Sequence, residues 1–85
     1  MKKADGTLNQ VLARRLMEVR RDRGLTLDQL SERTGLSKAY LCELEHGAKN
    51  PTLEVIERVA LALHIDASTL LQEAAASRQN PDDQR

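Results

Sequence analysis

The stretch Thr26–Glu45, TLDQLSERTGLSKAYLCELE, decides the fold. It predicts two short helices joined by a tight turn. Thr26 can cap the first helix, and Gln29 stands three residues later, where the second residue of a capping box belongs. Gly35 predicts the end of this helix, because glycine adopts the left-handed C′ conformation without a steric penalty. Ser37 is a good N-cap for the second helix.

The second of these helices has one apolar side and one outer side. Leu41 and Leu44 are three residues apart, so both point in the same direction. The outer side is left to small, polar and charged residues: Lys38, Ala39, Cys42, Glu43 and His46. A helix, a glycine turn and a second helix of this size form the pattern of a DNA-reading helix-turn-helix.

The composition sets limits on the whole chain. Its 85 residues are enough for one small domain, and with a single aromatic residue the core must be aliphatic. Such a core at helical spacing predicts an all-α bundle.

No apolar run approaches the roughly 18 residues of a membrane span, and no signal peptide is recognisable. The single cysteine, Cys42, has no intramolecular disulfide partner. We therefore expect a cytoplasmic protein.

A longer helix is predicted before this stretch, from about Leu8 to Arg23. Its apolar residues recur at steps of three and four, which is typical of a helix with one buried face. Thr7 and Gln10 have the spacing of a capping box. Residues 1–6 lack any periodicity and are expected to form a flexible arm.

Two further helices are predicted after this stretch. One runs from about residue 51 to 63, and His64 then occupies the place where glycine commonly ends a helix. Asp66 is a good N-cap for a fifth helix, at about 67–76. Residues 77–85 have no apolar anchor and are expected to be disordered.

The charges of the chain balance, with 13 basic and 13 acidic residues. This counts against nucleic-acid binding, since phosphate-binding proteins usually carry at least a local basic excess. The charges are unevenly distributed, however, and a neutral total can hide a basic face. Five of the basic residues fall in the first predicted helix: Arg14, Arg15, Arg20, Arg21 and Arg23.

Several segments together resemble the Cro/C1-type helix-turn-helix family, which has the lambda-repressor-like fold. They are TLDQL (26–30), TGLS (34–37), YL (40–41), ELEHG (43–47) and NPTL (50–53). The resemblance covers about Leu8 to Leu71. It implies a compact five-helix domain, at about 7–76, that binds a palindromic DNA operator as a homodimer and usually represses transcription. Small repressors of phages and plasmids are similar in size, and the chain also resembles plasmid repressors of the KorC type.

The resemblance implies that the helix at 38–46 enters the major groove, with Ser37, Lys38, Ala39 and Glu43 at the base-contacting positions. Lys38 can donate to guanine or to a phosphate, or it can be an ordinary solvated lysine. Ala39 offers a methyl group to thymine. Glu43 either accepts a hydrogen bond from cytosine N4 or points away from the DNA.

Other candidates would contact the DNA backbone. Thr26 and Ser37 are explained by their caps alone, although either helix N-terminus can also bind a phosphate. Tyr40 either packs along its helix or directs its hydroxyl to the backbone. Lys49 and Asn50 lie in a loop that is expected to run beside a DNA strand. Cys42 would also face the DNA.

Two structural roles complete the set of expected residues. Arg20 and Glu45 match the positions of a buried ion pair that links the first and third helices in many family members. Leu70, Leu71 and Ala74 lie on the apolar side of the fifth helix, and we expect them to form the dimer contact.

Other functional classes are less well supported. Cys42 and His46 are four residues apart and could form a thiolate–imidazole couple, but nothing in the sequence supplies an orienting group or a pocket. No residues have the spacing of a metal site, and no cofactor or small-molecule ligand is expected. The alternative to a repressor is a protein-interaction module, such as an antitoxin or an adaptor, that uses an acidic surface or the fifth helix.

Overall fold

A computed structural model describes residues 7–78. This part of the chain contains five α-helices and no strand, as expected: α1 (Leu8–Asp22), α2 (Leu27–Thr34), α3 (Lys38–Glu45), α4 (Leu53–Ala62) and α5 (Ala67–Arg78). The predicted helix boundaries differ from these by at most two residues. The expected arm at residues 1–6 and the part of the expected tail beyond residue 78 lie outside the described residues. No helix among those described is long and apolar enough to cross a membrane.

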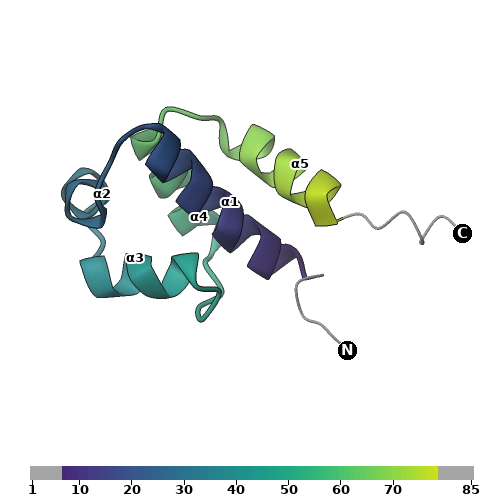
Figure 1. Ribbon diagram of the computed structural model, residues 1–85, viewed down its shortest axis with the longest axis horizontal. Coiled ribbons are helices and arrows are strands. Elements are labelled where there is room, and N and C mark those ends of the chain that lie inside the picture. The colour runs from purple at the N-terminus through teal and green to yellow at the C-terminus, as the bar shows by residue number, and fades with distance from the viewer. Residues whose placement is uncertain (1–6, 79–85) are drawn as a thin grey trace, which may run out of the picture.

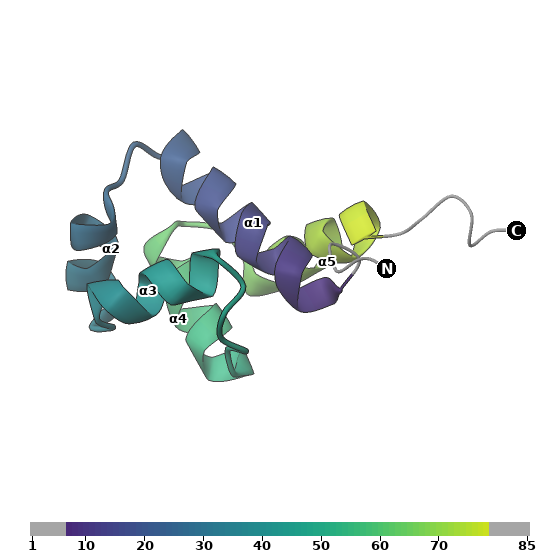
Figure 2. The same ribbon diagram turned by 60° about the horizontal axis from the view of Figure 1, so that its bottom comes forward.

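Helix α1 runs through the middle of the molecule (Figure 1). It packs against α5 on one side and against α3 on the other, while α2 contacts both α3 and α4. Helix α4 also packs against α5, which closes the bundle. Turning the molecule shows α4 at its periphery, below α3 (Figure 2).

Local capping explains where most of these helices begin. In each case a hydroxyl oxygen accepts a hydrogen bond from the backbone N–H three residues further along, at 3.0–3.1 Å, and the capping residues are Thr7, Thr26, Ser37 and Thr52. The capping box of α2 is complete, because the Thr26 N–H also donates to Gln29 Oε1 at 2.9 Å. The box expected at α1 is only half formed, since Gln10 Oε1 is buried and accepts no hydrogen bond there.

The turn between α2 and α3 is held by two hydroxyl groups. Gly35 ends α2 with φ of +79°, in the left-handed region that the sequence predicts. The buried Thr34 hydroxyl donates to Leu30 O at 2.8 Å and accepts from the Leu36 N–H at 3.1 Å. Ser31 Oγ donates to Leu36 O at 2.6 Å. These bonds fix the entry of the chain into α3, and the sequence analysis did not assign this role to either hydroxyl.

The apolar side of α5 completes the core of the single chain. Leu70 and Ala74 have no exposed surface, and Leu71 is half-buried against the same core. This corrects the expectation of a dimer contact at Leu70 and Ala74, because both are unavailable to a second molecule, and Leu71 stays an untested prediction. The apolar stripe of α1 is long enough to face α5 as well as α3, so α5 is used within the chain.

Candidate nucleic-acid interface

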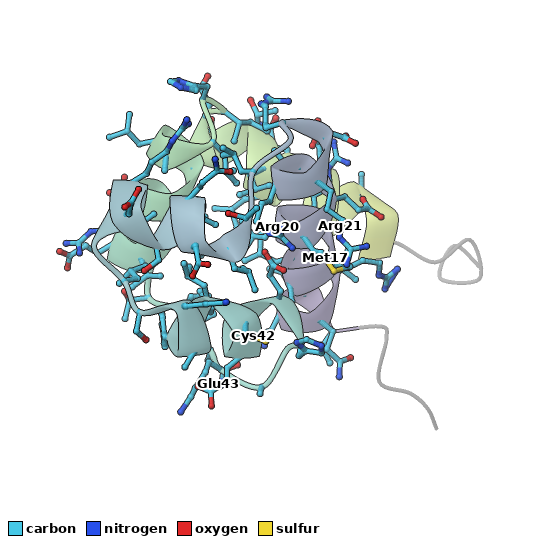
Figure 3. The ribbon with its side chains drawn as sticks, turned by 60° about the vertical axis from the view of Figure 1, so that its left-hand side comes forward. Met17, Arg20, Arg21, Cys42 and Glu43 are labelled. Atoms are coloured by element: carbon cyan, nitrogen blue, oxygen red, sulfur yellow. The ribbon has the colours of Figure 1, made fainter. Side chains whose placement is uncertain are left out.

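The outer side of α3 is the candidate interface. Leu41 and Leu44 are each 2% exposed and anchor the helix in the core. Because successive residues in a helix are turned by about 100°, the opposite side is left to the solvent. Lys38, Ala39, Glu43 and His46 are exposed there, and Cys42 and Tyr40 are half-buried. Figure 3 shows Glu43 at the outer edge of α3, away from α1.

Two capped helix N-termini border this surface. Thr26 and Ser37 are both exposed, and their oxygens already accept a hydrogen bond from their own helices. Each hydroxyl hydrogen is still available as a donor. The first turns of α2 and α3 also carry backbone N–H groups that lack a partner within the helix. Both N-termini are therefore chemically suited to an anion such as a phosphate.

The lysines of this surface are paired with carboxylates. Lys38 Nζ lies 3.4 Å from Asp28 Oδ1, and Lys49 Nζ lies 3.8 Å from Glu43 Oε1. All four side chains are at least half exposed, so each pair contributes little to stability and can exchange partners at small cost. The two cations and two anions leave this patch without net charge. Asp28 was not among the expected site residues.

The loop after α3 is held against the same surface. The Ala48 N–H donates to Glu43 O at 2.9 Å, and Asn9 Nδ2 donates to the Lys49 carbonyl at 3.3 Å. Lys49 and Asn50 are both exposed. Helix α1 therefore positions the loop through Asn9, a contact between residues far apart in the sequence that no local pattern indicated.

Arg20 and Glu45 form the ion pair that the family resemblance implied. Arg20 Nε and Nη2 donate to the two Glu45 carboxylate oxygens at 2.6 and 3.0 Å, and Arg20 Nη1 donates to Leu25 O at 2.7 Å. The two side chains are only 10% and 6% exposed. The hydrogen bonds to Glu45 raise the pKa of Arg20 further above its ordinary value, although burial opposes them. The pair links the end of α1 to the end of α3.

Three of the five arginines in or next to α1 bond to other groups of the molecule. Arg15 donates to Glu73 on α5 at 2.9 Å and to Glu18 at 3.2 Å. Arg23 Nε donates to the Leu63 carbonyl at 2.9 Å, near the end of α4. With Arg20 also paired, only Arg14 and Arg21 of the cluster are exposed and without such a bond to the described residues. The run of arginines therefore does not amount to the broad basic face that its charge suggested.

Cys42 and His46 lie side by side on α3. Cys42 Sγ is 3.7 Å from His46 Nδ1, and the same nitrogen is 2.8 Å from the Cys42 carbonyl oxygen. Within residues 7–78, no three His, Cys, Asp or Glu side chains are grouped so that they could hold a metal ion.

A capped helix with a free outer side, set beside a second helix across a glycine turn, defines a helix-turn-helix domain. Residues 13–75 match the family model described as a helix-turn-helix domain. The chain therefore belongs to the Cro/C1-type helix-turn-helix family, whose members are transcriptional regulators and not enzymes.

Three similar proteins illustrate this membership. The transcriptional regulator SinR of Bacillus subtilis is 31% identical over 64 residues, which cover 74% of this chain and 58% of SinR. The immunity repressor of Bacillus phage phi105 is 39% identical over 62 residues, covering 73% of this chain and 43% of the repressor. The crystal structure of the clp gene regulator ClgR from C. glutamicum superposes with a TM-score of 0.80 at 37% identity, covering 86% of this chain and 94% of that one. The match thus spans roughly half of the first two proteins and nearly all of the ClgR structure.

Proposed function

We propose that this protein is a sequence-specific DNA-binding regulator, and that it acts as a repressor on a palindromic operator. It binds as a homodimer, with α3 of each subunit in the major groove. The observation that carries the proposal is the free outer side of α3, flanked by two capped helix N-termini and a lysine-bearing loop.

The roles of the individual residues follow from their positions. Lys38, Ala39 and Glu43 face outward from α3 and read base edges. A carboxylate in the groove is repelled by phosphates unless it accepts a hydrogen bond, so Glu43 selects cytosine through its N4 amino group. Its neighbour Lys49 reduces the repulsion by placing a positive charge 3.8 Å from the carboxylate. Cys42, half-buried on the same side of α3, lies at the edge of the groove.

Phosphate contacts come from the border of the surface. The N-termini of α2 and α3, at Thr26 and Ser37, bind the backbone through N–H groups and hydroxyls. Lys49 and Asn50 bind it from the other end of α3, and the Tyr40 hydroxyl binds it from the first turn of α3. Because this patch has no net charge, we expect moderate affinity and a shallow dependence on salt. No cofactor or small-molecule ligand takes part, and the regulator acts in the cytoplasm, where bacterial DNA lies.

Selection of bound duplexes from a random DNA library at about physiological salt tests this proposal. Two inverted half-sites whose centres are about one helical turn apart, near 34 Å, are expected for a dimeric reader. Enrichment of a single half-site would reject the dimer but keep sequence-specific binding. Retention of DNA without an enriched motif would reject base reading by α3, since phosphate binding alone is independent of sequence.

One observation favours a second function, in which the same fold serves as a protein-interaction module. Both lysines of the α3 surface already have carboxylate partners, and two large apolar side chains of α4, Leu53 and Leu61, are exposed. Failure to retain any duplex at low salt, where phosphate binding is strongest, would support this alternative.

A further inference from the structure

The exposed apolar surface of the described chain is concentrated on α4. Leu61 is 77% exposed and Leu53 is 69% exposed, whereas the third large apolar residue at the surface, Leu8, is 36% exposed. On a wheel with about 100° per residue, Leu61 lies near the middle of the outer side of α4 and Leu53 at its edge. A single exposed leucine is ordinary in a monomeric protein. The exposure of Leu61 alone therefore does not indicate a contact.

The surface around Leu61 is hollowed, which gives it a shape suited to a contact. Leu61 lines two shallow hollows, of about 370 and 300 Å³, where α4 meets the start of α5. Ile65 and Asp66 line both hollows, His64 lines the first, and Glu57 lines the second. Both are too open to enclose a small molecule, which is normally buried over most of its surface. An exposed apolar side chain beside a hollow is instead what a two-fold contact requires, because each copy must supply both parts.

The charges beside Leu61 are complementary under the same symmetry. Glu57 is turned by about 40° to one side of Leu61 and Arg58 by about 60° to the other. Glu57 forms no ion pair with any described residue, and Arg58 has only a weak, exposed partner, with Nη2 3.6 Å from Glu54 Oε2. If the two-fold axis runs parallel to α4 on the side of Leu61, Glu57 of each copy lies near Arg58 of the other. Two further ionisable groups at this surface, Asp66 and His64, lie towards the start of α5, and Arg33 of α2 donates to the Ala62 carbonyl at 3.4 Å.

We propose that a second copy of this chain docks on this surface, with Leu61 at the axis and α4 packed against α4 of its partner. This rests on the homodimer of the proposed function and gives it an interface. It also replaces the contact through Leu70 and Ala74, which the core of each chain already uses. The contact is on α4, so the outer side of α3 stays free in both subunits.

A contact centred on one leucine is small, below the roughly 1,200 Å² of a stable complex, so the dimer dissociates readily without DNA. Sedimentation equilibrium of the full chain, without DNA and at micromolar to millimolar concentrations, measures this. We expect the average mass of the wild type to rise towards that of a dimer with concentration. Leu61→Glu should remain a monomer throughout, with an unchanged helical circular dichroism spectrum because its side chain is exposed.

Two variants make the test specific. Leu53→Glu adds the same charge at a similarly exposed position of α4, away from the hollows, and should associate as the wild type does. Glu57→Arg should weaken association at least tenfold, and the exchange Glu57→Arg with Arg58→Glu should restore it.

Two results of this experiment would overturn the proposed contact at Leu61. Association of Leu61→Glu equal to that of the wild type would overturn the proposed surface while leaving the dimer intact, and inverted half-sites would then still be selected from the DNA library. A wild type that remains a monomer at every concentration would overturn the surface as well. If such a protein still selected inverted half-sites, the proposed DNA binding would stand although the proposed dimer surface would not.

Discussion

Arg20 and Glu45 meet in two hydrogen bonds of 2.6 and 3.0 Å across the junction of α1 and α3, and both side chains are nearly buried. Glu45 occupies the last position of the helix whose outer side reads DNA in our proposal. The pair therefore sets the orientation of α3 relative to the bundle. In that proposal, stability and DNA recognition depend on the same contact.

Loss of one partner of this pair should be costly. Arg20→Met leaves the Glu45 carboxylate buried without its cation, and we expect the free energy of unfolding to fall by about 3–5 kcal/mol. Urea denaturation followed by circular dichroism measures this. The control is Arg15→Met, which removes the more exposed pair with Glu73 and should cost less than about 1 kcal/mol. Equal losses in the two variants would contradict the assigned role of Arg20.

The two roles of Ser37 can be separated by substitution. Ser37→Ala removes the cap of α3 and should cost about 1 kcal/mol of stability. Ser37→Asp keeps a capping oxygen and should preserve stability, but its charge should repel a phosphate and weaken DNA binding. Thermal unfolding and a binding titration on the selected operator measure the two effects. Unchanged DNA affinity in Ser37→Asp would reject the phosphate contact.

Glu43 and Lys49 should differ in how they affect binding. Glu43→Ala should remove the preference for one base pair, a discrimination of about 1–3 kcal/mol, and leave the other positions of the operator unchanged. Lys49→Met should weaken binding to all sequences and reduce the slope of log affinity against log salt concentration by about 1. Titrations on single-base operator variants at several salt concentrations give both quantities. A uniform loss in Glu43→Ala would show that its carboxylate does not read a base.

The backbone at His64 offers a way to stabilise the domain. His64 has φ of +60°, in the left-handed region that costs a residue with a Cβ about 1–2 kcal/mol. His64→Gly should relieve this strain, and after the added flexibility of the unfolded chain is counted, we expect a gain of up to about 1 kcal/mol. Gly35→Ala, at φ of +79° with open space around it, should destabilise for the same reason. A loss of stability in His64→Gly, measured by urea denaturation, would show that the histidine side chain outweighs the strain.

Leu70 should behave as a core residue and not as a subunit contact. Its side chain is completely buried between helices of one chain, so Leu70→Ala should cost about 2–5 kcal/mol of stability. The midpoint of urea denaturation, measured for the wild type and the variant at two protein concentrations, tests this. Because the lost contacts are within the chain, the difference between the two proteins should not depend on concentration. A difference that grows with concentration would return Leu70 to the dimer interface.

The sequence by itself determined the helices and the turn between α2 and α3. Caps and helix ends depend on groups within a few residues of one another, such as Thr26 with Gln29 and Ser31 with Gly35. The spacing of the leucines fixed which side of α3 is buried. The same local reasoning was wrong at Gln10, where the spacing of a capping box is present but the side chain turns into the interior.

Only the tertiary structure decided which groups meet across the bundle. Periodicity shows that Leu70 and Ala74 need an apolar partner, but it does not show whether that partner is α1 of the same chain or a second molecule. The sequence likewise does not show which groups the arginines of α1 contact. Arg15, for example, donates to Glu73, which is 58 residues away. These outcomes depend on how helices distant in the sequence pack to bury the largest apolar surface. That packing left Leu70 inside and Leu61 exposed, although both are leucines in helices of the same bundle.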